Sequence, residues 1–313
     1  MEQLLLIVFG PALLGLVAAL VVVWAVTRSQ RPRLAVGRGV RWWTLAGVVL
    51  ASAIVLAQQL PLGTPWHITR LSPTAHMMTL FTVPIVAGLI SVVVLTVPVE
   101  RRSGGRTAEL HRRTLTSFSK GGWFLTLAAT VVLTVAVAVW AGRASVPDDQ
   151  GRYTMYWIDL GPGGSMGSSI YGWHFSVPSL ALVALLVTAT LLAAGLIARP
   201  PLAQDRENDV AVRRWRTRNV MAMATGALLL HLARVVNSLA GTAGIYGQTQ
   251  TGQGLFTKGT PFAGLEGPLR VAADALEVCG WFFWFAVLFI ALRASAQTRD
   301  NSRSRAPWSS RSS

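Results

Sequence analysis

The chain carries NVMAMATGALLLHLARVVNSLAG at 219–241 and VAADALEVCGWFFWFAVLFIAL at 271–292, two apolar stretches that decide its fold class. An α-helix rises about 1.5 Å per residue, so each stretch is long enough to cross the ~30 Å hydrocarbon core of a bilayer. Backbone N–H and C=O groups find no water in that core, and a helix satisfies them internally. Both stretches therefore predict membrane-spanning helices.

Further apolar stretches of similar length precede these two, at 3–26, 42–60, 77–97, 123–142 and 177–198. Of the 313 residues, 52% are hydrophobic and 13% are charged. About a quarter of the residues in a soluble domain are charged, so this balance excludes an ordinary water-soluble enzyme. We expect an all-α fold: a single seven-helix membrane domain over 1–294, followed by a disordered, basic Ser/Arg-rich tail over 295–313.

The positive charges predict the orientation of the helices. Of the 28 lysines and arginines, 22 fall in alternate connecting segments, at 27–41, 99–120, 199–218 and 293–313. Segments rich in these residues face the cytoplasm, so we expect an external N-terminus and a cytoplasmic C-terminus. Division of the charge among four short segments favours anionic lipid headgroups as partners and argues against nucleic acid. The large excess of arginine over lysine indicates a G+C-rich bacterial genome, and hence the plasma membrane.

Two long loops on the external side, 143–176 and 242–270, are rich in glycine and aromatic residues. All four tyrosines of the chain lie in them. Tyrosine and tryptophan side chains on a loop tend to pack against other groups, so we expect an ordered external cap over the helix ends. The residues of 153–158 favour a strand followed by a turn. The predicted cap residues are Tyr153, Tyr156, Trp157, Tyr171, Trp173 and His174.

Ionisable residues inside two of the spans form the strongest candidate site. The sixth span contains His231, Arg234 and Asn237, and the seventh contains Asp274 and Glu277. Spacings of three place each set on one side of its helix. Arg234 and Glu277 fall at equal depth if the two helices are antiparallel neighbours, which predicts an ion pair, with Asp274 as a nearby second acid. The cluster is either a polar ligand site open to the outside or a pair that only joins two helices.

Other site chemistry has little support in the sequence. His76, His174 and His231 are candidates for metal or haem ligands, but none has the compact spacing of a known ligand motif, and we expect no cofactor. The single cysteine, Cys279, excludes an internal disulfide and a Cys-rich metal site. No catalytic residues are assigned, because no G-x-S-x-G nucleophile motif occurs. Both lysines fall in loops, which argues against a retinal Schiff base.

Three functions therefore compete. The first is a ligand-binding or transport-type membrane protein with an external polar site between the sixth and seventh helices. The second is a non-enzymatic accessory or scaffold subunit that binds a membrane-protein partner through its external loops. The third is a redox protein, or one that handles metal or haem, which uses the external histidines. An enzyme is the less favoured class.

Overall fold

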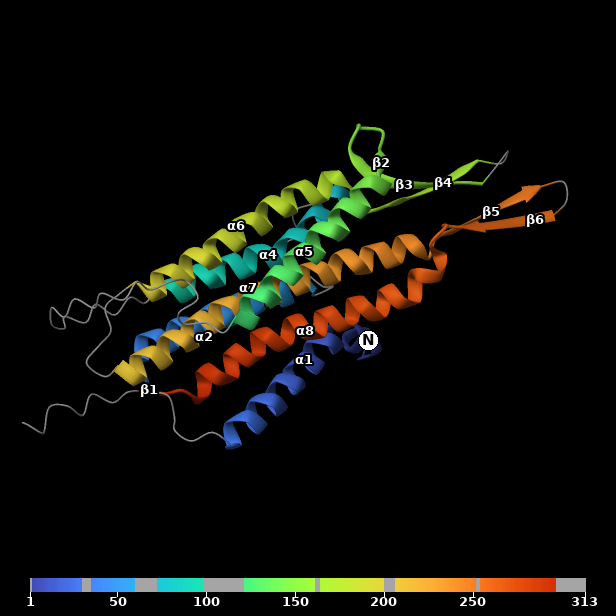
Figure 1. The fold of residues 1–313 in the computed structure, drawn as a ribbon. Helices are drawn as coiled ribbons and strands as arrows, with labels where there is room; N and C mark the ends of the chain where they lie inside the picture. The colour runs from blue at the N-terminus through green and yellow to red at the C-terminus, as the bar shows by residue number, and fades with distance from the viewer. Residues whose placement is uncertain are drawn as a thin grey trace, which may run out of the picture.

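The computed structural model describes residues 2–29, 35–59, 72–97, 121–160, 164–199, 206–251 and 254–296. Seven of its helices are long and apolar enough to cross a membrane, as the sequence predicts. They lie alongside one another as an elongated bundle (Figure 1). The helices are α1 (Glu2–Ser29), α2 (Arg38–Gln59), α4 (Pro73–Thr96), α5 (Gly121–Ala144), α6 (Trp173–Ala198), α7 (Arg206–Ala243) and α8 (Glu266–Arg293).

Helix α7 is the central helix, with 89% of its apolar segment buried, against 22% for α1. It begins at Arg206, far before the predicted start at 219, so the expectation of a connecting segment up to 218 is wrong. The buried Arg213 side chain explains the extension. It forms an ion pair with Asp209 at 2.9 Å and donates to the carbonyls of Ile197 and Ala198, where α6 ends. These carbonyls lack partners within their own helix, and the arginine supplies one.

Helices α7 and α8 cross at close range. A Cβ atom added to Gly226 would lie 2.5 Å from Cδ1 of Trp284, and one added to Gly280 would lie 3.0 Å from the Gly226 carbonyl oxygen. Trp281 and Trp284 are fully buried here. The Trp284 indole donates to the Met223 carbonyl at 3.0 Å. Both tryptophans thus pack between the helices, and glycine is required because the backbones approach so closely.

Helix α1 lies at the edge of the bundle, beside α8 (Figure 1). A stripe of buried residues, Ala12, Gly15, Ala19 and Val23, follows one side of the helix. A Cβ atom added to Gly15 would lie 2.7 Å from the Trp281 Cβ atom. From Leu13 to Val26, most of the remaining large side chains of α1 are exposed, as expected for a helix with one protein-facing side in lipid.

Short strands modify the all-α expectation in the connecting loops. At one end of the bundle, β2 (Val146–Pro147), β3 (Tyr153–Asp159) and β4 (Ser165–Ser169) form an antiparallel sheet. At the same end, β5 (Tyr246–Thr251) pairs with β6 (Gly254–Gly259) as a second hairpin (Figure 1). The predicted strand at 153–158 is confirmed as β3. We call these five strands the hairpin platform, and this end of the molecule the hairpin end.

The opposite end holds a small contact between the two halves of the chain. Strand β1 (Ala35–Val36) pairs in parallel with β7 (Ser295–Ala296). Arg41 Nη2 also donates to the Leu292 carbonyl at 3.2 Å. Residues 295 and 296 therefore belong to the folded part, which corrects the predicted boundary of the tail, and 297–313 lie outside the described residues.

Candidate functional site

Arg234 and Glu277 meet as predicted. Arg234 Nη2 donates to Glu277 Oε1 at 3.3 Å. Gln59, the last residue of α2, donates from Nε2 to the same oxygen at 2.8 Å. The carboxylate therefore joins three helices, α2, α7 and α8. Gln59 was not identified from the sequence, because nothing in a single sequence indicates which side chain its amide will meet.

This ion pair is looser than the others that the structure describes. Its side chains are 21% and 14% exposed for Arg234 and Glu277. Arg234 contributes no second hydrogen bond to any described residue, although a guanidinium has five donors. Three ion pairs with i,i+4 spacing are shorter: Arg152–Asp148 at 2.8 Å, and Arg213–Asp209 and Arg270–Glu266 at 2.9 Å each.

The polar residues beside this pair are exposed and do not bond to it. Asn237 and Asp274 are exposed side chains. Within the described residues neither of them forms a hydrogen bond with Arg234. Arg234 and Glu277 thus share their two helices with two exposed polar residues. Among the described residues, no group accepts from the remaining donors of Arg234 or donates to Glu277 Oε2.

His231 does not belong to this open cluster, contrary to the prediction. Its side chain is fully buried, and its Nδ1 lies 2.7 Å from the Phe81 carbonyl oxygen of α4. A carbonyl only accepts, so Nδ1 carries the proton, and Nε2 accepts from the Tyr171 hydroxyl at 3.5 Å. Three residues along an α-helix amount to a turn of about 300°, which leaves His231 about 60° from Arg234. That offset directs His231 to α4.

The His231 contact supports an interrupted stretch of α4. Pro84 lies inside this helix and has no N–H to donate to the preceding turn. The missing N–H would have donated to the Leu80 carbonyl, and His231 of the neighbouring helix contacts the next carbonyl along, that of Phe81. The rings of Phe81 and Tyr171 pack edge to face at 4.6 Å. Burial raises the pKa of the Tyr171 phenol, which keeps its proton available for donation.

The aromatic residues of the predicted cap divide into two groups. Tyr171 is buried, and Tyr156 packs edge to face on Phe262 at 5.3 Å. In contrast, Tyr153 and Trp157 are 47% and 48% exposed, so the expected packing of these two over the helix ends is wrong. Trp157 instead lies across β4, where Gly167 pairs with it.

The remaining cap residues lie where α6 begins. A Cβ atom added to Gly142 would lie 2.6 Å from the Trp173 ring, so this tryptophan packs on the end of α5. The His174 ring packs on that of Phe175 at 5.2 Å. Between the two hairpins, Lys258 Nζ donates to the Asp159 carbonyl at 2.6 Å.

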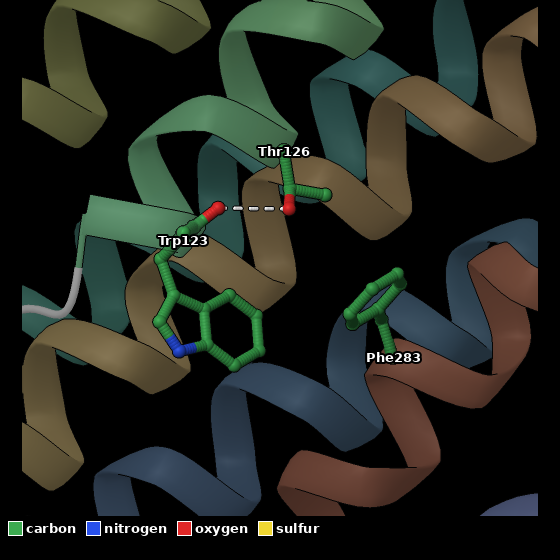
Figure 2. A pocket seen from close by; sticks show the side chains of 4 residues that line it. Trp123, Thr126 and Phe283 are labelled. Carbon is green, nitrogen blue, oxygen red and sulfur yellow. Dashed lines mark hydrogen bonds between the residues drawn. The ribbon is translucent and has the colours of Figure 1, made fainter.

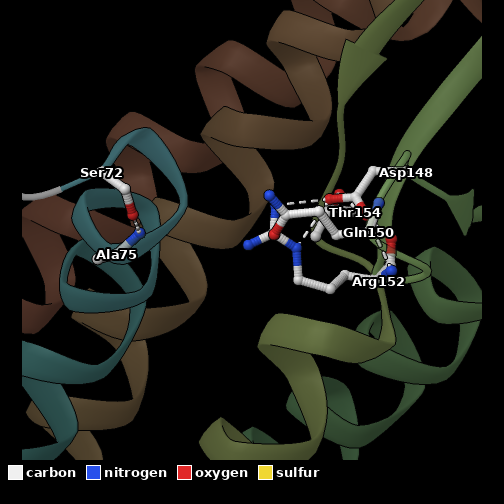
Figure 3. Close-up of polar contacts among 6 residues, drawn as sticks. All are labelled: Ser72, Ala75, Asp148, Gln150, Arg152 and Thr154. Carbon is white, nitrogen blue, oxygen red and sulfur yellow. Dashed lines mark hydrogen bonds and ion pairs between the residues drawn. The ribbon is translucent and has the colours of Figure 1, made fainter.

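An acidic residue holds the turn between β2 and β3. Asp148 accepts from the backbone N–H groups of Gln150 and Arg152, from the Arg152 guanidinium and from the Thr154 hydroxyl (Figure 3). Desolvation raises the pKa of Asp148, but these hydrogen bonds outweigh it and lower the pKa to about 2. The carboxylate form therefore orders the turn at neutral pH. Figure 3 also shows Ser72 at the start of α4, where its hydroxyl accepts from the Ala75 N–H at 3.3 Å.

The histidines do not converge. His76 is exposed at the start of α4, His174 packs on Phe175, and His231 is buried against α4 and Tyr171. Over the ranges that the structure describes, no group of three or more His, Cys, Asp or Glu side chains lies together in a way that would hold a metal ion. The three candidate ligands therefore form no common site there.

A second feature, which the sequence did not indicate, is an open groove of about 270 Å³ between α5 and α8. Gly122, Trp123, Thr126 and Phe283 line it. The Trp123 and Phe283 rings pack edge to face with their centroids 6.0 Å apart, and the Thr126 hydroxyl donates back to the Gly122 carbonyl (Figure 2). Its lining is mainly apolar.

Comparison of the chain with models of protein families, with curated proteins and with solved structures finds no match.

Proposed function

We propose that this chain is a ligand-binding or transport-type membrane protein that takes up a small polar solute at Arg234 and Glu277. One observation carries the proposal: at 3.3 Å the pair is longer than the three i,i+4 ion pairs described above, although its side chains are less exposed than those of Arg152–Asp148 and Arg270–Glu266. A pair that only joined two helices would gain most from short, closed geometry, because an incompletely satisfied arginine within a membrane is costly.

The chemistry of the pair favours a zwitterionic solute. The Arg234 guanidinium presents donors in a planar fork that suits a carboxylate. Glu277 accepts two hydrogen bonds at Oε1 and none at Oε2 from described residues, so Oε2 remains available to an ammonium group. A molecule with a carboxylate and an ammonium group a few bonds apart, such as an α-amino acid, would bind both. It would replace a weak contact by two charge-assisted hydrogen bonds.

A thermal-unfolding screen with the common amino acids tests this assignment. A solute present at about 100 times its Kd stabilises the folded state by about 2.7 kcal/mol. At least one amino acid should therefore raise the Tm of the protein in detergent. Its N-acetyl and amide derivatives, which lack the ammonium and the carboxylate respectively, should not do so.

The double variant Arg234→Leu/Glu277→Leu should fold but lose the Tm shift. The matched control is Arg270→Leu/Glu266→Leu, which removes the same two charges from an exposed pair on α8 and should retain the shift. A wild-type protein that no amino acid stabilises, or a double variant that responds as the wild type does, contradicts the assignment. The purely structural alternative predicts low folded yield for each single variant and recovery in the double variant, with no solute effect in any of them.

The hairpin platform favours a second candidate function, an accessory subunit that binds a membrane-protein partner. Tyr153, Trp157 and Tyr246 expose large aromatic surface there. Exposed aromatic residues of this kind are enriched at protein interfaces. Purification under mild conditions should then yield a partner in fixed stoichiometry that is lost from the variant Trp157→Ser/Tyr246→Ser. A partner retained by that variant would argue against the platform as its binding site.

Both functions depend on the orientation inferred from the basic segments, with the hairpin end outside the bacterial plasma membrane. Alkaline phosphatase is active only when exported. Fusion near Gly163 should give activity, and fusion after Arg305 should give none. The reverse pattern would place the proposed site on the cytoplasmic side.

A further inference from the structure

The same side of the bundle as the groove between α5 and α8 carries an arginine for which the described residues provide no hydrogen-bond partner. Arg218 of α7 is partly buried. Among the described residues, no carboxylate or carbonyl accepts a hydrogen bond from it. The preceding arginines of the same helix behave differently, since Arg213 and Arg216 donate to carbonyls where α6 and α4 end. A partly desolvated guanidinium without an acceptor calls for an anion.

Helix periodicity places Arg218 on the groove side of α7. Val236 packs with Val137 of α5 and Ala273 of α8, so this face of α7 lies beneath both helices. Arg218 precedes Val236 by eighteen residues, which is about five full turns at 3.6 residues per turn, and therefore shares its face. Helices α5 and α7 both run toward the hairpin end (Figure 1).

The depth of Arg218 also matches the groove. Val137 of α5 and Val236 of α7 lie in the same apolar cluster. Counting back from them along each helix, at 1.5 Å per residue, places Arg218 at about the same level as Gly121, where α5 begins. The aromatic pair Trp123 and Phe283 lies farther toward the hairpin end. A cation at the level of the helix terminus and an apolar groove farther along the same side match the two parts of an amphiphile.

We propose that this side of the bundle binds an anionic phospholipid, with its phosphate at Arg218 and an acyl chain in the groove. Charge complementarity identifies the headgroup as anionic, and the apolar lining identifies the rest of the ligand as hydrocarbon. The groove opens on the outer surface of helices that are apolar enough to span a membrane, where lipid chains are the neighbouring molecules. The site is distinct from Arg234 and Glu277, and the proposal does not depend on the solute.

Native mass spectrometry of the full chain, released from micelles that contain equal phosphatidylglycerol and phosphatidylcholine, tests the site. The wild type should retain phosphatidylglycerol preferentially. Arg218→Gln should weaken this retention about five-fold, the factor that corresponds to about 1 kcal/mol for one cationic side chain near an anionic surface. Arg218→Lys should restore most of it. Arg143→Gln removes an exposed arginine at the far end of α5 and should have no effect.

A second pair of variants tests the groove. Thr126→Phe fills it from an exposed position and should lower the retention of phosphatidylglycerol. The neighbouring Leu125 is 71% exposed and does not line the groove, so Leu125→Phe is the matched control. Equal retention of the two lipids by the wild type, or equal effects of Arg218→Gln and Arg143→Gln, would overturn the headgroup assignment. An unchanged Thr126→Phe variant would overturn the acyl-chain assignment.

Discussion

Replacement of His231 by leucine should destabilise the protein, although the ring lies outside the proposed solute site. Leucine has a similar apolar bulk, so the change removes hydrogen bonds more than packing. The Phe81 carbonyl loses a contact of 2.7 Å, and the Tyr171 hydroxyl loses one of 3.5 Å. Both groups are buried between α4, α6 and α7, where water cannot replace the lost partner.

The magnitude follows from these two distances. A buried polar group left without a partner costs about 1–3 kcal/mol. Hydrogen bonds between membrane helices average about 0.6 kcal/mol and reach about 1.7 kcal/mol. The short Phe81 contact belongs at the upper end of that range and the long Tyr171 contact near the lower end. We therefore expect His231→Leu to lower the free energy of unfolding by about 2 kcal/mol, and Tyr171→Phe to lower it by less than about 1 kcal/mol.

Unfolding in mixed micelles with increasing fractions of sodium dodecyl sulfate measures the loss. The decisive control is His231→Asn, because the asparagine amide nitrogen lies at the same position along the side chain as Nδ1 and still donates to Phe81. This variant should recover at least half of the stability lost in His231→Leu. Equal stability of the wild type and His231→Leu would refute the supporting role of the contact. Equal losses in the leucine and asparagine variants would assign the effect to packing.

Three further outcomes are expected elsewhere in the molecule. Because the pKa of Asp148 falls from 3.8 to about 2 in the folded state, its contribution to the turn is complete above pH 3.8 and is lost as the pH falls toward 2. As the pH falls from 3.8 toward 2, the amide hydrogen exchange of the turn, corrected for intrinsic rates, should become faster in the wild type but not in Asp148→Asn. Gly226→Val forces Trp284 away from α7 and should cost about 1–3 kcal/mol in the same unfolding assay, as overpacked cores do, whereas no loss would contradict the close crossing. Gly15→Leu should increase amide hydrogen exchange in α1 and leave that in α7 unchanged. Unchanged protection of both helices would contradict the docking of α1 on α8 through the buried stripe around Gly15.

The helices and one ion pair could be predicted because they follow from the residue types of one stretch and from counting positions along the chain. The length of an apolar stretch is set by the thickness of the bilayer, and the depth of Arg234 and Glu277 follows from counting residues. The early start of α7 could not be predicted in this way. The stretch from Arg206 to Arg218 is too charged for a hydropathy signal, and its helix depends on carbonyls at the end of α6 that Arg213 meets only in the folded bundle.

The contacts of His231 and Gln59 were missed for a different reason. His231 binds a backbone carbonyl 150 positions away, and Gln59 binds a carboxylate 218 positions away. Neither partner has a sequence signature, since every residue carries a carbonyl and exposed acids are common. The exposure of Trp157 was missed as well, because its ring lies over a glycine of the neighbouring strand and not on a helix end.

The docking of α1 on α8 also sets an order of events during biogenesis. The ribosome delivers α1 well before α8, so the stripe around Gly15 has no α8 surface to meet until the five described helices between them have been synthesised. The first helix must wait in the bilayer, or beside the insertion machinery, while the intervening helices enter. Contacts of such large sequence separation slow folding. Chains truncated before α8 should therefore expose the stripe to quality-control proteases, and β1 can pair with β7 only after α8 has been made.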